Sequence, residues 1–163
     1  MTRRLAIYLN DHLAGSIVGS ELAKRALREN HGSEFEETLE WLLAQILEDR
    51  ATLERLMEEL GVAKSRVKGA LALALERVGR LKLNGQLTGY SPLSRLVELE
   101  GLAIGVTEKL ALWESLREVA GDEPGLAGFD AERLADRARA QLERLRAERL
   151  KAARLALTGP RNA

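Results

Sequence analysis

Residues 26–39, ALRENHGSEFEETL, contain the turn that decides the fold. Long segments with apolar side chains at helical spacing lie on both sides of this turn. Gly32 can adopt the left-handed conformation that closes a helix, and Ser33 with Glu36 three positions later is the pattern of a capping box. The stretch therefore predicts two helices that fold back on one another.

Turn and capping residues of this kind, between segments of helical periodicity, predict five helices along the chain, and no segment shows strand-like alternation. They run from about Arg3 to Asn30, Ser33 to Leu60, Ala63 to Asn84, Ser91 to Ala120 and Asp130 to Leu157. Four of them match in length, whereas the third is shorter. This order predicts an all-α up-down bundle in which the third helix crosses over to start the fourth at the far end. We expect one domain over residues 1–158 and a disordered tail over residues 159–163.

The composition excludes several classes of protein. Lys+Arg and Asp+Glu are 25 each, so no overall field draws the chain to nucleic acid or to an acidic membrane. Without cysteine there is no disulfide, thiolate nucleophile or thiolate metal site. Asp11 and His12 interrupt the first apolar stretch too early for a signal peptide, and no apolar run is long enough to span a bilayer. We therefore expect a cytoplasmic protein without a membrane partner.

Two ionisable residues occupy positions where the apolar stripes require a hydrophobic side chain. His12 lies near the centre of the inner face of the first helix, and Asp49 lies between Ile46 and Leu53 on the second. Folding the two helices back at the turn brings His12 level with Asp49 or Arg50. A buried ionisable pair is costly unless it is hydrogen-bonded or holds a ligand. We expect the two side chains to meet inside the protein.

The fourth and fifth helices extend this polar layer. The inner face predicted for residues 91–120 runs through Leu93, Leu96, Ile104 and Ala111 and also contains Glu100, Thr107 and Glu114. A hairpin of the fourth and fifth helices brings Glu100 near Arg149, so we expect these two to form an ion pair. At the level of His12 and Asp49, the bundle topology places Thr107 on the fourth helix and Gln141 on the fifth. In a structural interpretation, which we favour, these four side chains satisfy one another and fix the helix register. In a functional interpretation, His12, Asp49 and Glu114 hold a divalent metal ion or a small ligand.

Three stretches carry a resemblance to a known family: YLNDHLAGS at residues 8–16, GRLKLNG at residues 79–85 and SPLSRLVELEGLAIGV at residues 91–106. With the hairpin, crossover and second hairpin, the chain resembles an uncharacterised group of bacterial ferritin-like proteins. The resemblance implies a four-helix bundle over nearly the whole chain, and it implies no activity.

The di-iron enzymes of the ferritin-like superfamily carry Glu-x-x-His motifs on their inner helix faces. In this chain Glu48 is followed at the third position by Ala51, and the helix at residues 130–157 has no histidine. The ligand motif is not intact, so oxidase, ferroxidase and iron-storage activities are not implied.

The third predicted helix has a basic face, and two tryptophans lie at the edges of their stripes. The basic residues are Arg66, Lys68, Arg77, Arg80 and Lys82. Because the second helix is strongly acidic and stacking aromatic residues are missing from the basic face, nucleic acid is the less favoured partner of that face. Trp41 and Trp113 predict either a homodimer contact or plain rim packing.

From the sequence we predict a non-enzymatic binding or scaffold protein, homodimeric, without a cofactor. One alternative is a metal- or small-ligand-binding protein that uses His12, Asp49 and Glu114. A second alternative is a nucleic-acid or acidic-partner binder that uses the basic face.

Overall fold

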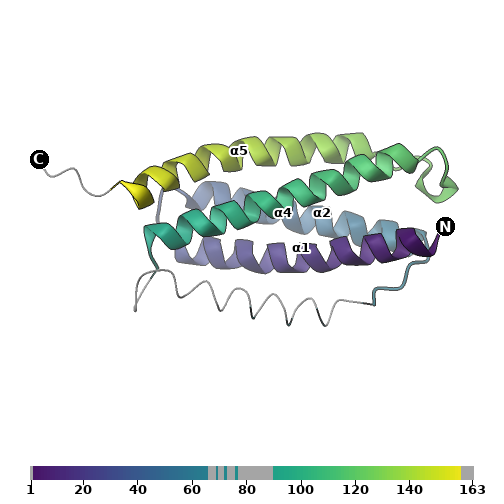
Figure 1. Ribbon diagram of the computed structural model, residues 1–163, viewed down its shortest axis with the longest axis horizontal. Coiled ribbons are helices and arrows are strands. Elements are labelled where there is room, and N and C mark those ends of the chain that lie inside the picture. The colour runs from purple at the N-terminus through teal and green to yellow at the C-terminus, as the bar shows by residue number, and fades with distance from the viewer. Residues whose placement is uncertain (1, 66–68, 70–71, 73–75, 77–89, 159–163) are drawn as a thin grey trace, which may run out of the picture.

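The computed structural model describes residues 2–65, 69, 72, 76 and 90–158. Four long helices of this part form an elongated bundle (Figure 1). They are α1 (Arg3–Glu29), α2 (Glu36–Glu59), α4 (Pro92–Val119) and α5 (Ala131–Leu157), with a short 3-10 turn, η2 (Pro124–Leu126), before the last. No strand occurs among the described residues, which confirms the all-α class. Most of the predicted third helix, all five residues of its basic face and the tail at 159–163 lie outside the described residues.

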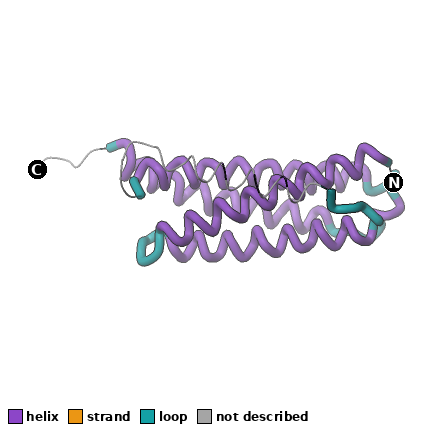
Figure 2. Tube along the Cα trace, turned by 90° about the horizontal axis from the view of Figure 1, so that it is seen from below, coloured by secondary structure: helices purple, strands orange, loops and turns teal. Residues whose placement is uncertain are grey.

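Two antiparallel hairpins make up the bundle, α1 with α2 and α4 with α5. α1 packs against α2 and α4, and α5 packs against α4 and α2. Figures 1 and 2 show that α4 begins at the end of the bundle opposite to the one where α2 ends. α2 and α4 therefore run in the same direction, whereas α1 and α4 run in opposite directions.

Side-chain caps explain where three of the helices begin. The Thr2 side chain accepts a hydrogen bond from Leu5 N at 3.2 Å before α1. Ser91 does the same for Ser94 N at 3.0 Å before α4, where Pro92 occupies the first turn. Asp130 caps α5, with its Oδ1 3.1 Å from Arg133 N. Each cap satisfies a backbone donor that has no partner inside its helix.

The turn between α1 and α2 differs from the predicted capping box. Ser33 Oγ donates to Asn30 O at 2.7 Å and accepts from Phe35 N at 3.3 Å, and α2 begins only at Glu36. The Glu36 carboxylate accepts from Gly32 N at 2.7 Å and pairs with His31. Gly32 has a φ of 74°, as the prediction of a left-handed residue requires. The cap of α2 is therefore Phe35, two residues after the predicted Ser33.

The core uses a different face of α4 from the one predicted. Ile104 is 70% exposed and Leu93 is 38% exposed, whereas Leu99, Leu102 and Val106 are buried. The prediction was wrong because residues 96–106 carry apolar side chains on both sides of the helix, so that periodicity does not select the inner one.

The structure places the two tryptophans in different surroundings, one in the core and one near the surface. Trp113 is only 1% exposed and packs beside Phe129, with the ring centroids 5.9 Å apart. Its predicted position at a stripe edge was wrong, so it offers no surface to a partner. Trp41 is half-buried beneath the Arg144 guanidinium, 4.7 Å from the ring centroid. The predicted homodimer stays a prediction that rests on Trp41 alone.

Within the described ranges, no helix combines the length and the apolar character that crossing a bilayer requires.

Candidate functional site

Asp49 is the centre of a buried ionic cluster in the middle of the bundle. The carboxylate is 3% exposed. One oxygen pairs with Arg137, and the other pairs with Lys109 and accepts a hydrogen bond from Gln141 Nε2 at 3.1 Å. Lys109 also donates to Gln141 Oε1. We call Asp49, Lys109, Arg137 and Gln141 the central cluster.

The central cluster joins three helices. Asp49 lies on α2, Lys109 on α4, and Arg137 and Gln141 on α5. Burial lowers the pKa of Lys109, and the neighbouring Asp49 charge opposes that shift. Because a cation of the protein pairs with each carboxylate oxygen, the negative charge of Asp49 is neutralised within the protein.

His12 lies near this cluster without joining it. The imidazole is half-buried and stands edge-on to the Tyr8 ring, with the centroids 4.5 Å apart. Burial lowers the pKa of His12, against the opposing effects of the Glu108 and Asp11 carboxylates. The neutral form is therefore favoured near neutral pH.

The predicted polar layer is realised only in part. His12 and Asp49 line one cavity, but no hydrogen bond joins them in the part of the chain that the structure describes. The direct contact expected between them was therefore wrong. Gln141 does contact Asp49. Thr107 is exposed and donates to Ala103 O at 2.8 Å, so its place in the layer was wrong as well.

Lys109 takes the place that was expected for Thr107. Two positions along an α-helix turn a side chain by about 200°, so the error lies in the face of α4 and not in its level. The same error explains why Ile104 and Leu93, which were predicted to lie on the inner face of the helix, are exposed.

The metal-ligand set predicted from the sequence does not assemble. Glu114 pairs with Arg139 at 2.6 Å and is 42% exposed, away from the Asp49 carboxylate. No group of three or more histidine, aspartate or glutamate side chains that could hold a metal ion occurs among the described residues. The set His12, Asp49 and Glu114 was therefore wrong as a coordination site, because each side chain has other neighbours.

A cavity of about 60 Å³ lies between α1, α2 and α4. Gly15 and Gly19 of α1 and Gly105 of α4 contribute no side chain to its wall. At Gly19 and Gly105 an added Cβ would meet no atom within 4 Å. An alanine would therefore fit at Gly19 or Gly105 without a clash.

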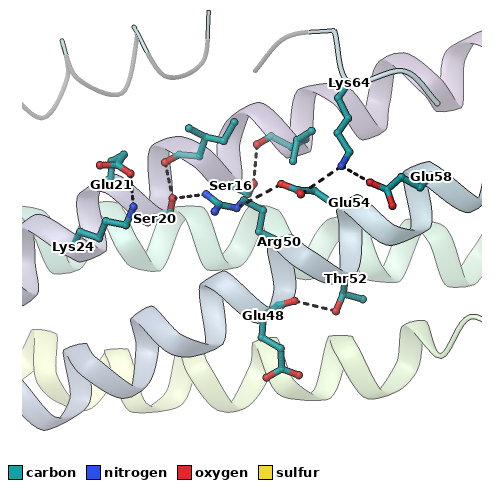
Figure 3. Close-up of polar contacts among 12 residues, drawn as sticks. Ser16, Ser20, Glu21, Lys24, Glu48, Arg50, Thr52, Glu54, Glu58 and Lys64 are labelled. Carbon is teal, nitrogen blue, oxygen red and sulfur yellow. Dashed lines mark hydrogen bonds and ion pairs between the residues drawn. The ribbon is translucent and has the colours of Figure 1, made fainter. Parts of the chain in front are cut away.

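Polar groups at the rim of the cavity bond to their own helices or to one another (Figure 3). Arg50 reaches from α2 to α1 and donates to Ser20 Oγ at 3.1 Å. Ser16 Oγ donates to Leu13 O at 2.7 Å, within its own helix. Because Ser16 donates within its helix and not to His12, the rim does not present the pair that nucleophilic catalysis needs.

A second buried ionic group lies where α1 ends and α4 begins. Glu98 is fully buried and pairs with Arg25 at 3.0 Å. Tyr90 donates its hydroxyl proton to Glu98 at 2.7 Å and accepts from Asn30 at 2.9 Å. Arg95 pairs with the Asn30 side chain. We call these five residues the end cluster.

Sequence reasoning missed the end cluster. Burial raises the pKa of Glu98, with the Tyr90 hydrogen bond and the Arg25 charge opposing it, and burial also raises the pKa of Tyr90. A signal was present, because Glu98 stands four positions before Leu102 on the true inner face of α4.

No protein-family model, curated protein or solved structure shows significant similarity to this chain.

Proposed function

We propose that this chain is a non-enzymatic binding or scaffold protein with a ferritin-like arrangement of helices, in which the central cluster fixes how the two hairpins meet. One observation carries the proposal. The Asp49 carboxylate of one hairpin is held by Lys109, Arg137 and Gln141 of the other. A shift of either hairpin by one helical turn would leave a buried charge unpaired, which costs several kcal/mol.

The order and direction of the helices support the ferritin-like part of the proposal. The first hairpin, α1 with α2, is followed by a second hairpin, whose first helix, α4, starts at the end of the bundle opposite to the one where α2 ends (Figure 1). The contacts of Asp49 with Lys109 and of the Phe35 ring with Arg95 fit two parallel helices. Without a Glu-x-x-His motif, the proposal includes no di-iron chemistry.

The test is a pair of double-mutant cycles that share Arg137. Its guanidinium pairs with Asp49, which is 3% exposed, and also with Glu48, which is 56% exposed. Both acids are replaced by alanine, alone and with Arg137→Ala, and the free energy of unfolding is measured in urea. We expect a coupling of about 2 kcal/mol for Asp49 and about 0.5 kcal/mol for Glu48. Equal couplings would refute a special role of the buried carboxylate.

The basic face supplies a second prediction that stays untested. Charge reversal at Arg66, Lys68, Arg77, Arg80 and Lys82 should abolish salt-sensitive binding if a polyanion is the partner. Location in the cytoplasm and a homodimer remain parts of the proposal. Light scattering of wild type and Trp41→Ala tests the dimer.

A further inference from the structure

Most of the large hydrophobic side chains that the described residues expose lie on one face of the bundle. α4 and α5 pack side by side along the bundle and form this face (Figure 1). Its exposed apolar side chains are Leu93 and Ile104 of α4 and Leu150 and Leu157 of α5. Single exposed hydrophobic side chains are ordinary, whereas a group of them on one face marks a contact surface.

Ion pairs between α4 and α5 show that these apolar side chains point the same way. Glu100 lies about two turns after Leu93, on the same side of α4, and its carboxylate pairs with an arginine of α5 at 3.9 Å. Arg139 lies about three turns before Leu150, on the same side of α5, and pairs with a glutamate of α4 at 2.6 Å. We call the outward side of residues 93–111 of α4 and 139–157 of α5 the outer face.

The charges of the outer face divide between the two helices. On α4 the charged side chains of this face are acids, Glu100 and Glu108. On α5 they are bases with one exception: Arg139, Arg146, Arg149 and Arg154 against Glu143. An acidic stripe and a basic stripe thus run beside one another, and both contain apolar side chains. A nucleic acid or an anionic membrane carries one sign of charge, so the acidic stripe would repel it.

A second copy of this chain can match both stripes, depending on the symmetry axis. Most homo-oligomers are two-fold dimers, in which the same patch of both copies forms the interface. A two-fold axis parallel to the helices lays α4 of one copy on α5 of the other, so that acids face bases. An axis across the helices lays α4 on α4 and α5 on α5, so that acids face acids and bases face bases. Because like charges that are held together weaken association, the parallel axis is favoured.

The levels of the side chains agree with the parallel axis. The ion pair at Glu100 sets which residues of α4 and α5 are level. Leu93 of one copy then meets Leu157 of the other, and Arg146 lies level between Glu100 and Glu108. We propose that the outer face binds a second copy of this chain, with the two-fold axis parallel to the helices. This dimer rests on the homodimer of the proposed function and gives it an interface.

The size of the outer face indicates a weak dimer. From Leu93 to Ala111 the face is about 27 Å long, and two helices are about 20 Å wide. Two such faces bury on the order of 1,100 Å² in total, which is near the lower limit of a specific interface. We therefore expect a Kd on the order of 10 µM.

Two charge reversals test the interface by sedimentation velocity of the full-length chain. Glu108→Arg and Arg146→Glu each place like charges together in both contacts of the dimer, so each variant alone should dimerise at least tenfold more weakly than wild type. An equimolar mixture should form dimers again, because one contact of the mixed dimer is that of wild type and the other has both charges exchanged. An axis across the helices would instead make Glu108→Arg dimerise more tightly. That result, or no recovery on mixing, would overturn the inference.

A matched pair of apolar positions locates the interface. Ile104 is 70% exposed, so Ile104→Lys should fold as wild type does, with the same circular dichroism, and should dimerise at least tenfold more weakly. Ile7 is also exposed but lies on α1, away from the outer face, so Ile7→Lys should dimerise as wild type does. Equal effects of the two variants would overturn the inference.

The remaining outcomes separate this interface from the proposed function. A wild type that stays monomeric at about 200 µM, well above the expected Kd, would overturn the inference and leave the double-mutant cycles at Asp49 unaffected. A dimer that Trp41→Ala abolishes and Ile104→Lys leaves intact would overturn it while the homodimer stands. Binding of wild type to vesicles of anionic lipid that Ile104→Lys abolishes would assign the outer face to a membrane surface, and would overturn it as well.

Discussion

The central cluster and the end cluster bury a carboxylate in the same bundle but surround it differently. Asp49 is 3% exposed and has two cations and an amide around it. Glu98 is fully buried and has the Arg25 guanidinium and the Tyr90 hydroxyl. Burial raises the pKa of Glu98, whereas in the central cluster burial acts on the cation and lowers the pKa of Lys109. Burial thus disfavours the ionised acid in the end cluster and the ionised lysine in the central cluster.

The largest expected effect is at the acid with two cations. Asp49→Leu leaves Lys109 and Arg137, each 15% exposed, without their shared carboxylate. We expect a loss of about 3–5 kcal/mol in the free energy of unfolding, measured by urea denaturation followed by circular dichroism. Glu48→Leu removes the exposed partner of Arg137 and should cost less than about 1 kcal/mol. Similar losses in the two variants would show that the burial of Asp49 does not matter.

A smaller effect is expected at the phenol of the end cluster. Tyr90→Phe removes a hydroxyl that donates to Glu98 and accepts from Asn30. Because Glu98 is buried, its oxygen loses a partner that water does not replace, and we expect a cost of about 1–3 kcal/mol in the same urea assay.

Tyr8→Phe is the control for that variant. Its hydroxyl donates to Ser115 at 3.2 Å on the exposed side of the bundle. Water can replace this bond, so the change should stay below about 0.5 kcal/mol. If Tyr8→Phe cost as much as Tyr90→Phe, the end cluster would contribute no more than a surface hydrogen bond.

The third effect is a dependence on pH with a defined sign. The pKa of Glu98 is raised in the folded state, so its contribution to stability is fully present below the unfolded value of 4.5 and is lost as the pH rises through the folded value. Wild type should therefore lose stability relative to Glu98→Gln between pH 4 and pH 8, in urea denaturation at each pH.

Glu132 should show the opposite sign. The hydrogen bond from Arg117 lowers its pKa, so its contribution is present above 4.5 and is lost as the pH falls. Wild type should gain stability relative to Glu132→Gln as the pH rises. A common sign in the two comparisons would contradict the contrast between buried and exposed carboxylates.

Features of the fold and of the candidate site could be predicted from the sequence where they depend on residues close together in the chain. The starts of α4 and α5 were predicted within one residue, because a helix start depends on a side chain and a backbone donor only three positions away. Asp49 was found because it interrupts a clear apolar stripe. Its position at the level of Gln141 followed from helix lengths and the direction of the chain.

The rest required the packed structure. The inner face of α4 could not be chosen, because apolar residues such as Leu102 and Ile104 lie on both sides. Glu98 was missed for that reason. Lys109 and Arg137 were missed because long side chains reach across to a neighbouring helix, and sequence spacing within one helix says nothing about that reach.

The smallest effect is expected for an ion pair that the sequence did predict. The hairpin of α4 and α5 was expected to bring Glu100 near Arg149, and the two groups lie 3.9 Å apart. They are 47% and 36% exposed, so water screens the pair and each side chain loses entropy when it is held in place. Arg149→Met, which keeps most of the aliphatic stem, should change the free energy of unfolding by less than about 0.5 kcal/mol in urea, and salt should not alter the result. A loss above about 1 kcal/mol would mean that the pair carries a share of the hairpin's stability comparable to the end cluster. An exposed ion pair would then stabilise the protein about as much as a buried hydrogen bond, which would contradict the difference that we expect between Glu100 and Asp49.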